Sequence, residues 1–207
     1  GREANGVTRI AGRILGGGRV TEPLKILMVL DNASPSRARQ MVSTINSRFP
    51  QGNEPDKTAR GRDERIIELR IPADYQDRPG DFLRVVQGLQ LEQSYPDEYA
   101  RRYADDMVRE PALAAQLSFC LEAIGEPSKK FLYPLYDHAE IVPRMAALRA
   151  GAALGDIRAV PALSDLAMEG PPGVRAQAIE MLASLDAGPR VDDVLIALLG
   201  EAELDVR

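Results

Sequence analysis

The residue types that most often carry chemistry are scarce in this sequence. The 207-residue chain holds one histidine, His138, and one cysteine, Cys120. A single residue of each type cannot build a disulfide framework or the usual Cys/His zinc site. We expect His138 at the end of a helix, where its charge is stabilised by the helix dipole. Cys120 lies in an apolar stretch with no neighbouring base or cation, which indicates a buried small hydrophobic residue and not a nucleophile.

Two acidic pairs and one glycine-rich stretch are the other candidates for chemistry. Asp105-Asp106 and Asp192-Asp193 are of the type that serves acid–base catalysis or binds divalent cations. We interpret Asp105-Asp106 as a solvated helix face and Asp192-Asp193 as the charged start of a helix near Val191. The stretch from Gly12 to Gly18 lacks the Gly-Lys-Ser/Thr ending of a phosphate-binding loop, and no helix opens after it. We therefore predict no catalytic residue, no cofactor-binding residue, no metal ligand and no bound cofactor.

Charge is divided unevenly along the chain. Residues 1–92 hold 15 Lys/Arg and 12 Asp/Glu, whereas residues 93–207 hold 11 and 19, for a total net charge of −5. Neither half has the concentrated basic face of a nucleic-acid-binding protein, and no nucleic-acid partner is expected. The most basic stretch is diluted by acidic neighbours and has no interleaved aromatic residues. Its arginines are Arg60, Arg62, Arg65, Arg70 and Arg78.

The first half alternates between strand and helix patterns. Leu24–Leu30 and Ile66–Ile71 are short apolar runs typical of strands. Between them, Ser34 as a cap and Pro35 as a first residue predict an amphipathic helix that ends near Pro50. Residues 51–64 indicate a solvated loop or strand extension. A short helix from Pro79 and a third, edge strand at Leu89–Glu92 complete a predicted two-layer α/β sandwich.

Residues 16–92 resemble part of the flagellar basal-body P-ring protein. The matching features are a Gly-Gly-Gly-Arg-Val sequence before a strand, a helix carrying Ser36-Arg37-Ala38-Arg39 and Ile45-Asn46-Ser47-Arg48-Phe49, and a strand ending in Pro72. Members of that family are exported and assemble into a ring in the peptidoglycan layer. The resemblance therefore implies a non-enzymatic, self-assembling, periplasmic or cell-envelope module.

The second half shows a repeat of about 31 residues. Arg144, Ala147 and Leu148 recur as Arg175, Ala178 and Ile179, and Leu163 recurs as Leu195. Each unit is predicted to be two helices, and the units resemble the short, Ala/Gly-rich bacterial type of HEAT repeat. This resemblance covers residues 111–207 and implies an all-α superhelical solenoid that binds a protein partner. A two-helix unit cannot bury both faces of its apolar stripe alone, so neighbouring units must stack.

The recurring arginines Arg144, Arg175 and Arg207 have two interpretations. They pair with an acidic residue of a neighbouring unit, such as Asp156 or Asp205, or they form a ladder for an anionic partner. The excess of acidic residues in this half favours the structural role.

Together these patterns predict a P-ring-like α/β domain at 1–92, a linking helix at 93–110 and HEAT-like repeats at 111–207. The sequence begins without Met and ends on what looks like the start of a helix, so we expect a segment of a longer protein with a fourth repeat cut off at Arg207. No run reaches the ~20 apolar residues of a membrane-spanning helix. The leading hypothesis is a structural scaffold of the bacterial envelope that self-assembles through the α/β domain and holds a protein partner on the repeats. The alternatives are a cytoplasmic HEAT-repeat adaptor or regulatory protein with no flagellar role, and an enzyme or nucleic-acid binder that uses the solenoid groove.

Overall fold

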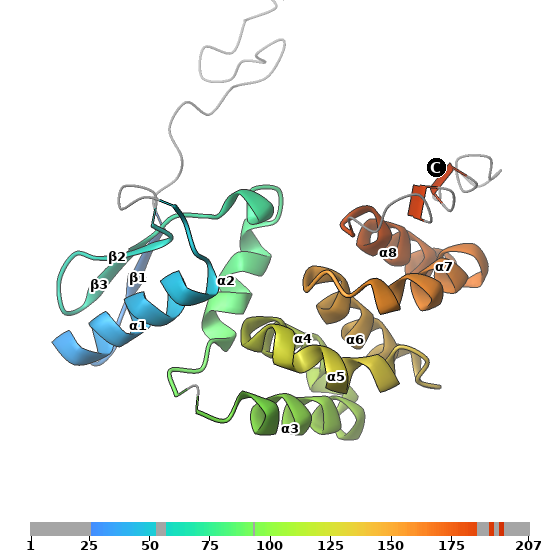
Figure 1. Ribbon diagram of the computed structural model, residues 1–207, viewed down its shortest axis with the longest axis horizontal. Coiled ribbons are helices and arrows are strands. Elements are labelled where there is room, and N and C mark those ends of the chain that lie inside the picture. The colour runs from blue at the N-terminus through green and yellow to red at the C-terminus, as the bar shows by residue number, and fades with distance from the viewer. Residues whose placement is uncertain (1–25, 53–56, 93, 186–190, 193–194, 197–207) are drawn as a thin grey trace, which may run out of the picture.

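The structure is a computed structural model that describes residues 26–52, 57–92, 94–185, 191–192 and 195–196. Several sequence predictions fall outside these ranges: the Gly12–Gly18 stretch, Asp193, Asp205 and Arg207. Within them, the chain is mostly helical, with one small three-stranded antiparallel sheet at one end (Figure 1).

The sheet is built from strands β1 (Ile26–Val29), β2 (Ala59–Gly61) and β3 (Ile66–Leu69). Its spatial order is β1-β3-β2, so β3 is central and antiparallel to both neighbours. The register places Ile26 of β1 and Ala59 of β2 opposite Leu69 of β3. Side chains alternate along β3, because Ile67 and Leu69 are buried while Glu68 is partly exposed.

Prolines mark the starts of the first three α-helices. Helices α1 (Pro35–Arg48), α2 (Pro79–Gly88) and α3 (Pro96–Arg109) each have proline at the first helical position, where its missing N–H has no intrahelical partner to lose. Ser34 is the N-cap residue of α1. These three starts agree with the sequence predictions.

Helices α1 and α2 cover one face of the sheet and share a core with it. The core residues that they contribute include Ile45 and Phe49 from α1 and Phe82 and Val85 from α2. Phe119 and Ala123 belong to the same core, although they come from α4, far along the chain. The helical part of the molecule thus contributes residues to the hydrophobic core of the sheet part.

The helical part begins with α3 and continues to α8, with short 3-10 turns between the helices (Figure 1). Its helices are α4 (Ala114–Ile124), α5 (Lys129–Leu132), α6 (Ile141–Ala153), α7 (Val160–Glu169) and α8 (Pro172–Ala183), and its turns include η3 (Pro111–Leu113), η4 (Glu126–Ser128), η5 (Tyr133–Leu135) and η6 (Ile157–Ala159). Helix α3 contributes Ala100 and Met107 to the core of this part. The predicted linking helix is therefore also a packing element.

Two glycines end helices at corresponding positions of the sequence. Gly125 follows α4 with φ 88°, and Gly155 follows α6 with φ 67°. A residue with a Cβ is strained at such positive φ values, so glycine is required to end both helices in this way. The two glycines lie 30 residues apart in the sequence.

The prediction of a third strand at Leu89–Glu92 is wrong. The backbone N–H of Leu89 instead donates to Val86 O at the end of α2, and the chain then runs to α3. The third strand is β2, inside the segment 51–64 that the sequence indicated as loop or strand extension. Its Ala-Arg-Gly sequence carries no strand pattern of its own, and tertiary contacts decide its conformation.

The helix pair α2–α4 joins the two parts at close range. A Cβ at Gly88 of α2 would lie 3.1 Å from Cys120 Cα on α4, so only glycine allows this separation without a shift of one helix. Figure 1 shows α2 between the sheet with α1 on one side and helices α4 to α8 on the other.

Candidate protein-binding grooves

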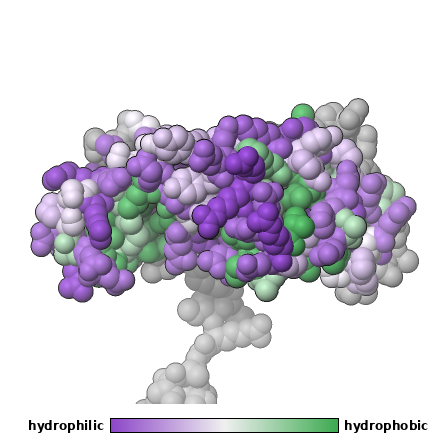
Figure 2. Space-filling model, turned by 90° about the horizontal axis from the view of Figure 1, so that it is seen from below, coloured by the Kyte–Doolittle hydropathy of each residue, from purple (hydrophilic) through white to green (hydrophobic). Residues whose placement is uncertain are grey.

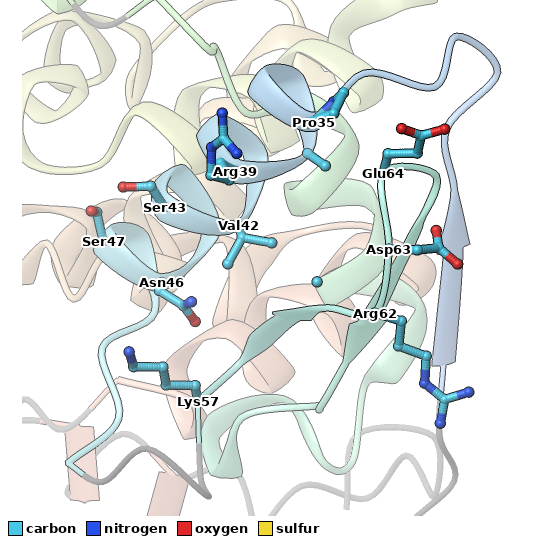
Figure 3. Close-up of a pocket in the computed structure, with 12 residues that line it drawn as sticks. Pro35, Arg39, Val42, Ser43, Asn46, Ser47, Lys57, Arg62, Asp63 and Glu64 are labelled. Atoms are coloured by element: carbon cyan, nitrogen blue, oxygen red, sulfur yellow. The ribbon is translucent and has the colours of Figure 1, made fainter.

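The first groove, called here the α1 groove, lies between α1 and the β2–β3 turn (Figure 3). Its volume is about 870 Å³, and Figure 3 shows Val42 and Asn46 on the helix side and Arg62 and Asp63 on the strand side. The Asp63 carboxylate accepts the backbone N–H groups of Arg65 and Ile66, and these bonds lower the pKa of Asp63. On this side the groove is therefore bounded by a turn whose conformation is stabilised by the hydrogen bonds of Asp63.

Asn46 covers the outer edge of β2 inside this groove. Its Nδ2 donates to Ala59 O at 2.9 Å, and its Oδ1 accepts from Ala59 N at 2.9 Å. The carboxamide thus occupies the two backbone groups that a further strand would need, and Val42 faces the next outward-facing residue, Gly61. The edge of β2 is consequently protected by α1.

Replacing Asn46 should destabilise the sheet. Asn46→Ala leaves the N–H and C=O of the fully buried Ala59 without partners, and we expect a loss of about 2 kcal/mol in the free energy of unfolding. The control Ser43→Ala removes an exposed hydroxyl on the same helix and should change it by less than about 0.5 kcal/mol. Urea unfolding followed by circular dichroism measures both. Equal midpoints for the two variants would contradict the role given to Asn46.

The second groove, called here the α8 groove, lies between the η2–α2 segment, with η2 at Ala73–Tyr75, and helices α6 and α8. Its volume is about 790 Å³, and both parts of the molecule contribute to it. Its charged residues are Asp74, Asp77, Arg78, Asp81, Arg149 and Glu180.

The two arginines of the α8 groove are engaged by the protein itself. The Arg78 guanidinium lies over the Tyr75 ring at 5.2 Å, and Arg149 Nη1 forms an ion pair with Glu122 Oε2 at 2.8 Å. Asp81 lies 3.7 Å from Arg84. The groove is lined by four carboxylates and only two guanidinium groups, so its lining is acidic.

Beneath the α8 groove lies a buried polar cluster, called here the junction cluster, formed by Tyr75, Glu122, Arg149 and Ser118. Glu122 of α4 is 1% exposed. Its carboxylate accepts the Tyr75 hydroxyl at 2.6 Å and Arg149 Nη1 at 2.8 Å. Arg149 Nε also donates to Ser118 Oγ at 2.7 Å. The cluster therefore joins η2, α4 and α6 across the boundary between the two parts.

Aromatic and backbone contacts complete the junction. The Arg149 guanidinium stacks 3.7 Å from the Phe119 ring centroid, and Arg48 of α1 donates to the backbone carbonyls of Glu122 and Ala123. Burial and the neighbouring Glu122 carboxylate raise the pKa of Tyr75 far above its usual value, so its hydroxyl stays protonated and remains a donor. The junction is held by charge, ring stacking and backbone bonds together.

A second buried cluster lies at the start of η6. The Asp156 carboxylate is 4% exposed and accepts the Tyr136 hydroxyl at 2.9 Å and two bonds from the Arg158 guanidinium. Burial alone would raise the pKa of Asp156, but the bonds from Arg158 and Tyr136 outweigh it and hold the pKa below its usual value.

This cluster should make part of the stability depend on pH. The folded carboxyl releases its proton more readily than the unfolded one, so its contribution is complete above about pH 4 and disappears as the pH falls through the lowered folded pKa. We expect Asp156→Asn to unfold at a lower urea concentration at pH 7, with the difference from the wild type shrinking toward pH 3. A difference that stays constant from pH 7 to pH 3 would contradict this assignment. Urea midpoints across that range are the measurement.

The structure gives His138 and Cys120 local structural environments. His138 lies in the turn between η5 and α6, where its Nδ1 accepts the backbone N–H of Glu140 at 3.1 Å. It precedes a helix and does not end an α-helix, so the predicted dipole role is wrong. Cys120 of α4 is only partly buried, against Gly88 of α2. Burial raises the pKa of its thiol, which disfavours the nucleophilic thiolate.

The acidic pairs lie where the sequence indicated, as far as the structure describes them. Asp106 of α3 lies 3.6 Å from Arg102 and 3.7 Å from Arg109, and Asp105 is exposed. Asp192 is exposed as well. In the described ranges, no cluster of three or more His, Cys, Asp or Glu side chains is arranged to hold a metal ion.

The predicted pairing of the recurring arginines with Asp156 is wrong. Asp156 instead accepts bonds from Arg158, two residues after it, and from the buried Tyr136. Arg144 instead lies 3.9 Å from Asp137, and Arg175 Nε donates to Ala167 O. In the basic stretch, Arg62 pairs with Glu68 at 2.9 Å.

Comparisons with known proteins found no match to this chain. No family model matches it, and no curated protein or solved structure is significantly similar to it. In the part of the chain that the structure describes, no helix combines the length and the apolar character needed to cross a bilayer.

Proposed function

We propose that this protein is a non-enzymatic scaffold of the bacterial envelope. In this proposal residues 16–92 form a P-ring-like module that self-associates, and residues 111–207 form a HEAT-like solenoid that holds a protein partner. The sequence resemblances motivate both assignments. The alternative is a cytoplasmic adaptor or regulatory protein with the same partner-binding surface and no flagellar role.

The observation that carries the binding role is the α8 groove. It is lined from η2, α2, α6 and α8, and the junction cluster beneath it connects two of these elements, η2 and α6, through α4. A groove whose walls are already held in place binds a partner with less loss of conformational entropy than one that must be ordered on binding. The glycine turns at Gly125 and Gly155, 30 residues apart, support the repeat on which the solenoid proposal rests.

The acidic lining of this groove bears on the kind of partner. Asp74, Asp77, Asp81 and Glu180 would repel a polyanion such as a nucleic acid. Retention of DNA by the wild type at low salt would therefore overturn the scaffold proposal and favour a nucleic-acid-binding one.

A binding experiment with paired variants tests the groove. The purified protein is immobilised and exposed separately to envelope and cytosolic fractions of the source cells. We expect a protein retained by the wild type and by Asp105→Arg on exposed α3, but not by Asp77→Arg or Glu180→Arg, which reverse charges in the α8 groove. Equal retention by all four proteins would overturn the groove as the binding surface.

Fractionation of the native, full-length protein distinguishes the scaffold from the adaptor. Recovery with the periplasm or the envelope is the expected result. Recovery in the cytoplasm would overturn the envelope assignment and favour the adaptor.

A further inference from the structure

The α8 groove has carboxylates on both of its walls that the protein leaves unpaired. Asp74 lies in η2 and Asp77 follows it, whereas Glu180 lies in the last turn of α8 on the opposite wall. All three residues are exposed, and in the part of the chain that the structure describes none of their carboxylates forms an ion pair or a hydrogen bond. Their charges are therefore available to a partner.

Two helix ends add to the negative potential of the groove. Ala152 and Ala153, the last residues of α6, line it together with Glu180 and Met181 from the last turn of α8. The carboxyl end of a helix carries a partial negative charge, which a nearby cation stabilises. Neither α6 nor α8 has a basic residue in its last turn. A cation in the groove would thus meet two helix ends in addition to the unpaired carboxylates.

Apolar atoms in the same lining favour a long cationic side chain over a small inorganic cation. Ala152 is buried and Met181 is half-buried, and a methionine side chain adapts its shape to a neighbour. The stems of lysine and arginine pack on such atoms while their charged ends contact carboxylates. The described acidic residues, by contrast, form no cluster arranged to hold a metal ion.

Arg149 gives a reason to expect a peptide backbone as well. This residue lines the groove, and its Nη2 is a buried donor with no hydrogen-bond partner among the described residues. A buried donor without an acceptor costs free energy. The carbonyl oxygen of a peptide bond is an acceptor that a bound peptide would bring.

We propose that the α8 groove binds a basic peptide segment of a partner protein. Arginine or lysine side chains of the segment pair with Asp77 on one wall and Glu180 on the other, and their stems pack on Met181. A backbone carbonyl of the segment accepts a hydrogen bond from Arg149. This inference rests on the proposed role of the α8 groove and names the chemical class of its partner.

Charge favours this occupant over the others. Residues 186–207, which follow α8 in the sequence, carry six Asp/Glu and two Arg, so their charge does not complement the lining. Nucleic acids and anionic lipid surfaces are repelled by the same carboxylates. Figure 2 shows one face of the molecule on which hydrophilic residues predominate and apolar residues form separate patches. On that face, too, the molecule offers a partner mostly polar and charged groups.

Fluorescence anisotropy with the full chain and a labelled probe peptide tests the proposal. The probe alternates arginine with alanine, and a peptide with glutamate in place of arginine is its control. We expect the wild type to bind only the arginine peptide. Asp77→Arg and Glu180→Arg should each weaken binding by about tenfold or more, because like charges then meet. Asp105→Arg makes the same change of charge on exposed α3 and should weaken it by less than about twofold.

A neutral variant separates the loss of pairing from repulsion. Asp77→Asn/Glu180→Gln keeps the size of both side chains and should still weaken binding of the arginine peptide. Binding by the wild type should also decrease as the salt concentration rises, because salt screens exposed charges. Unchanged binding by the neutral variant would overturn the pairing of the peptide with these two carboxylates.

The remaining outcomes separate this inference from the proposed function. A wild type that does not bind the arginine peptide, or an equal loss in Asp105→Arg, would overturn the inference. If Asp77→Arg and Glu180→Arg still lost the protein retained from the cell fractions, the α8 groove would remain the binding surface. If those variants retained it as well, both proposals would be overturned. Peptide binding only after deletion of residues 1–25 would indicate that this segment of the same chain occupies the groove, which also overturns the inference.

Discussion

Glu122→Ala should lower the free energy of unfolding by about 3 kcal/mol or more. The substitution leaves the Arg149 guanidinium without its carboxylate and the Tyr75 hydroxyl without its acceptor. Removing one partner of a buried ion pair costs about 3–5 kcal/mol, because the remaining charge is left uncompensated. Urea unfolding at pH 7, followed by circular dichroism, measures the loss.

Two controls separate the buried charge from ordinary truncation. Asp97→Ala breaks an ion pair with Lys130 in which both side chains are 56% exposed, and it should cost less than about 1 kcal/mol. Glu122→Leu/Arg149→Met removes both charges of the buried pair and should recover much of the stability lost in Glu122→Ala. A loss for Glu122→Ala no greater than for Asp97→Ala would contradict the importance assigned to the junction cluster.

Gly151→Ala should lower the free energy of unfolding by about 3 kcal/mol. The added Cβ would lie 2.7 Å from Tyr136 Cζ, and Tyr136 is 1% exposed and held by Asp156. The ring must shift and lose its hydrogen bond to Asp156, so overpacking and a buried hydroxyl without its acceptor combine. Thermal unfolding and urea midpoints both report this change.

A glycine on α8 provides the matched control. A Cβ at Gly173 of α8 meets no atom within 4 Å, so Gly173→Ala should be neutral or stabilise the protein by up to about 1 kcal/mol. Gly151→Ala combined with Tyr136→Phe should recover part of the loss, because the hydroxyl that meets the new methyl group is removed. If Gly151→Ala were as harmless as Gly173→Ala, the close approach of Tyr136 to α6 would be disproved.

Local signals in the sequence predicted the helices more successfully than the sheet. The linking helix predicted at 93–110 is α3, which begins at Pro96 and ends at Arg109. Proline and capping residues act on the neighbouring backbone, so their effect can be predicted without the rest of the fold. Strand β2 has no such signal in its own sequence. Its conformation depends on hydrogen bonds to Asn46 and to β3.

The junction cluster could not be predicted from the sequence for a related reason. Glu122 binds Tyr75, 47 residues before it, and Arg149, 27 residues after it. One local signal was present, since Glu122 interrupts the apolar run Phe119-Cys120-Leu121. A carboxylate in such a run indicates a buried partner, but only the fold identifies it. The pairing of Arg158 with Asp156 was equally hard to predict, because this bidentate contact depends on the turn at Gly155.

Helix α4 has an arrangement with consequences for how the molecule unfolds. It places Phe119 and Ala123 in the core of the sheet part and Ala114 and Leu121 in the core of the helical part. Melting this one helix would open both cores at once, so neither can come apart while the other stays intact. The boundary near residue 92 therefore marks a change of architecture but not a break in cooperativity, and the described chain is expected to denature in a single two-state step.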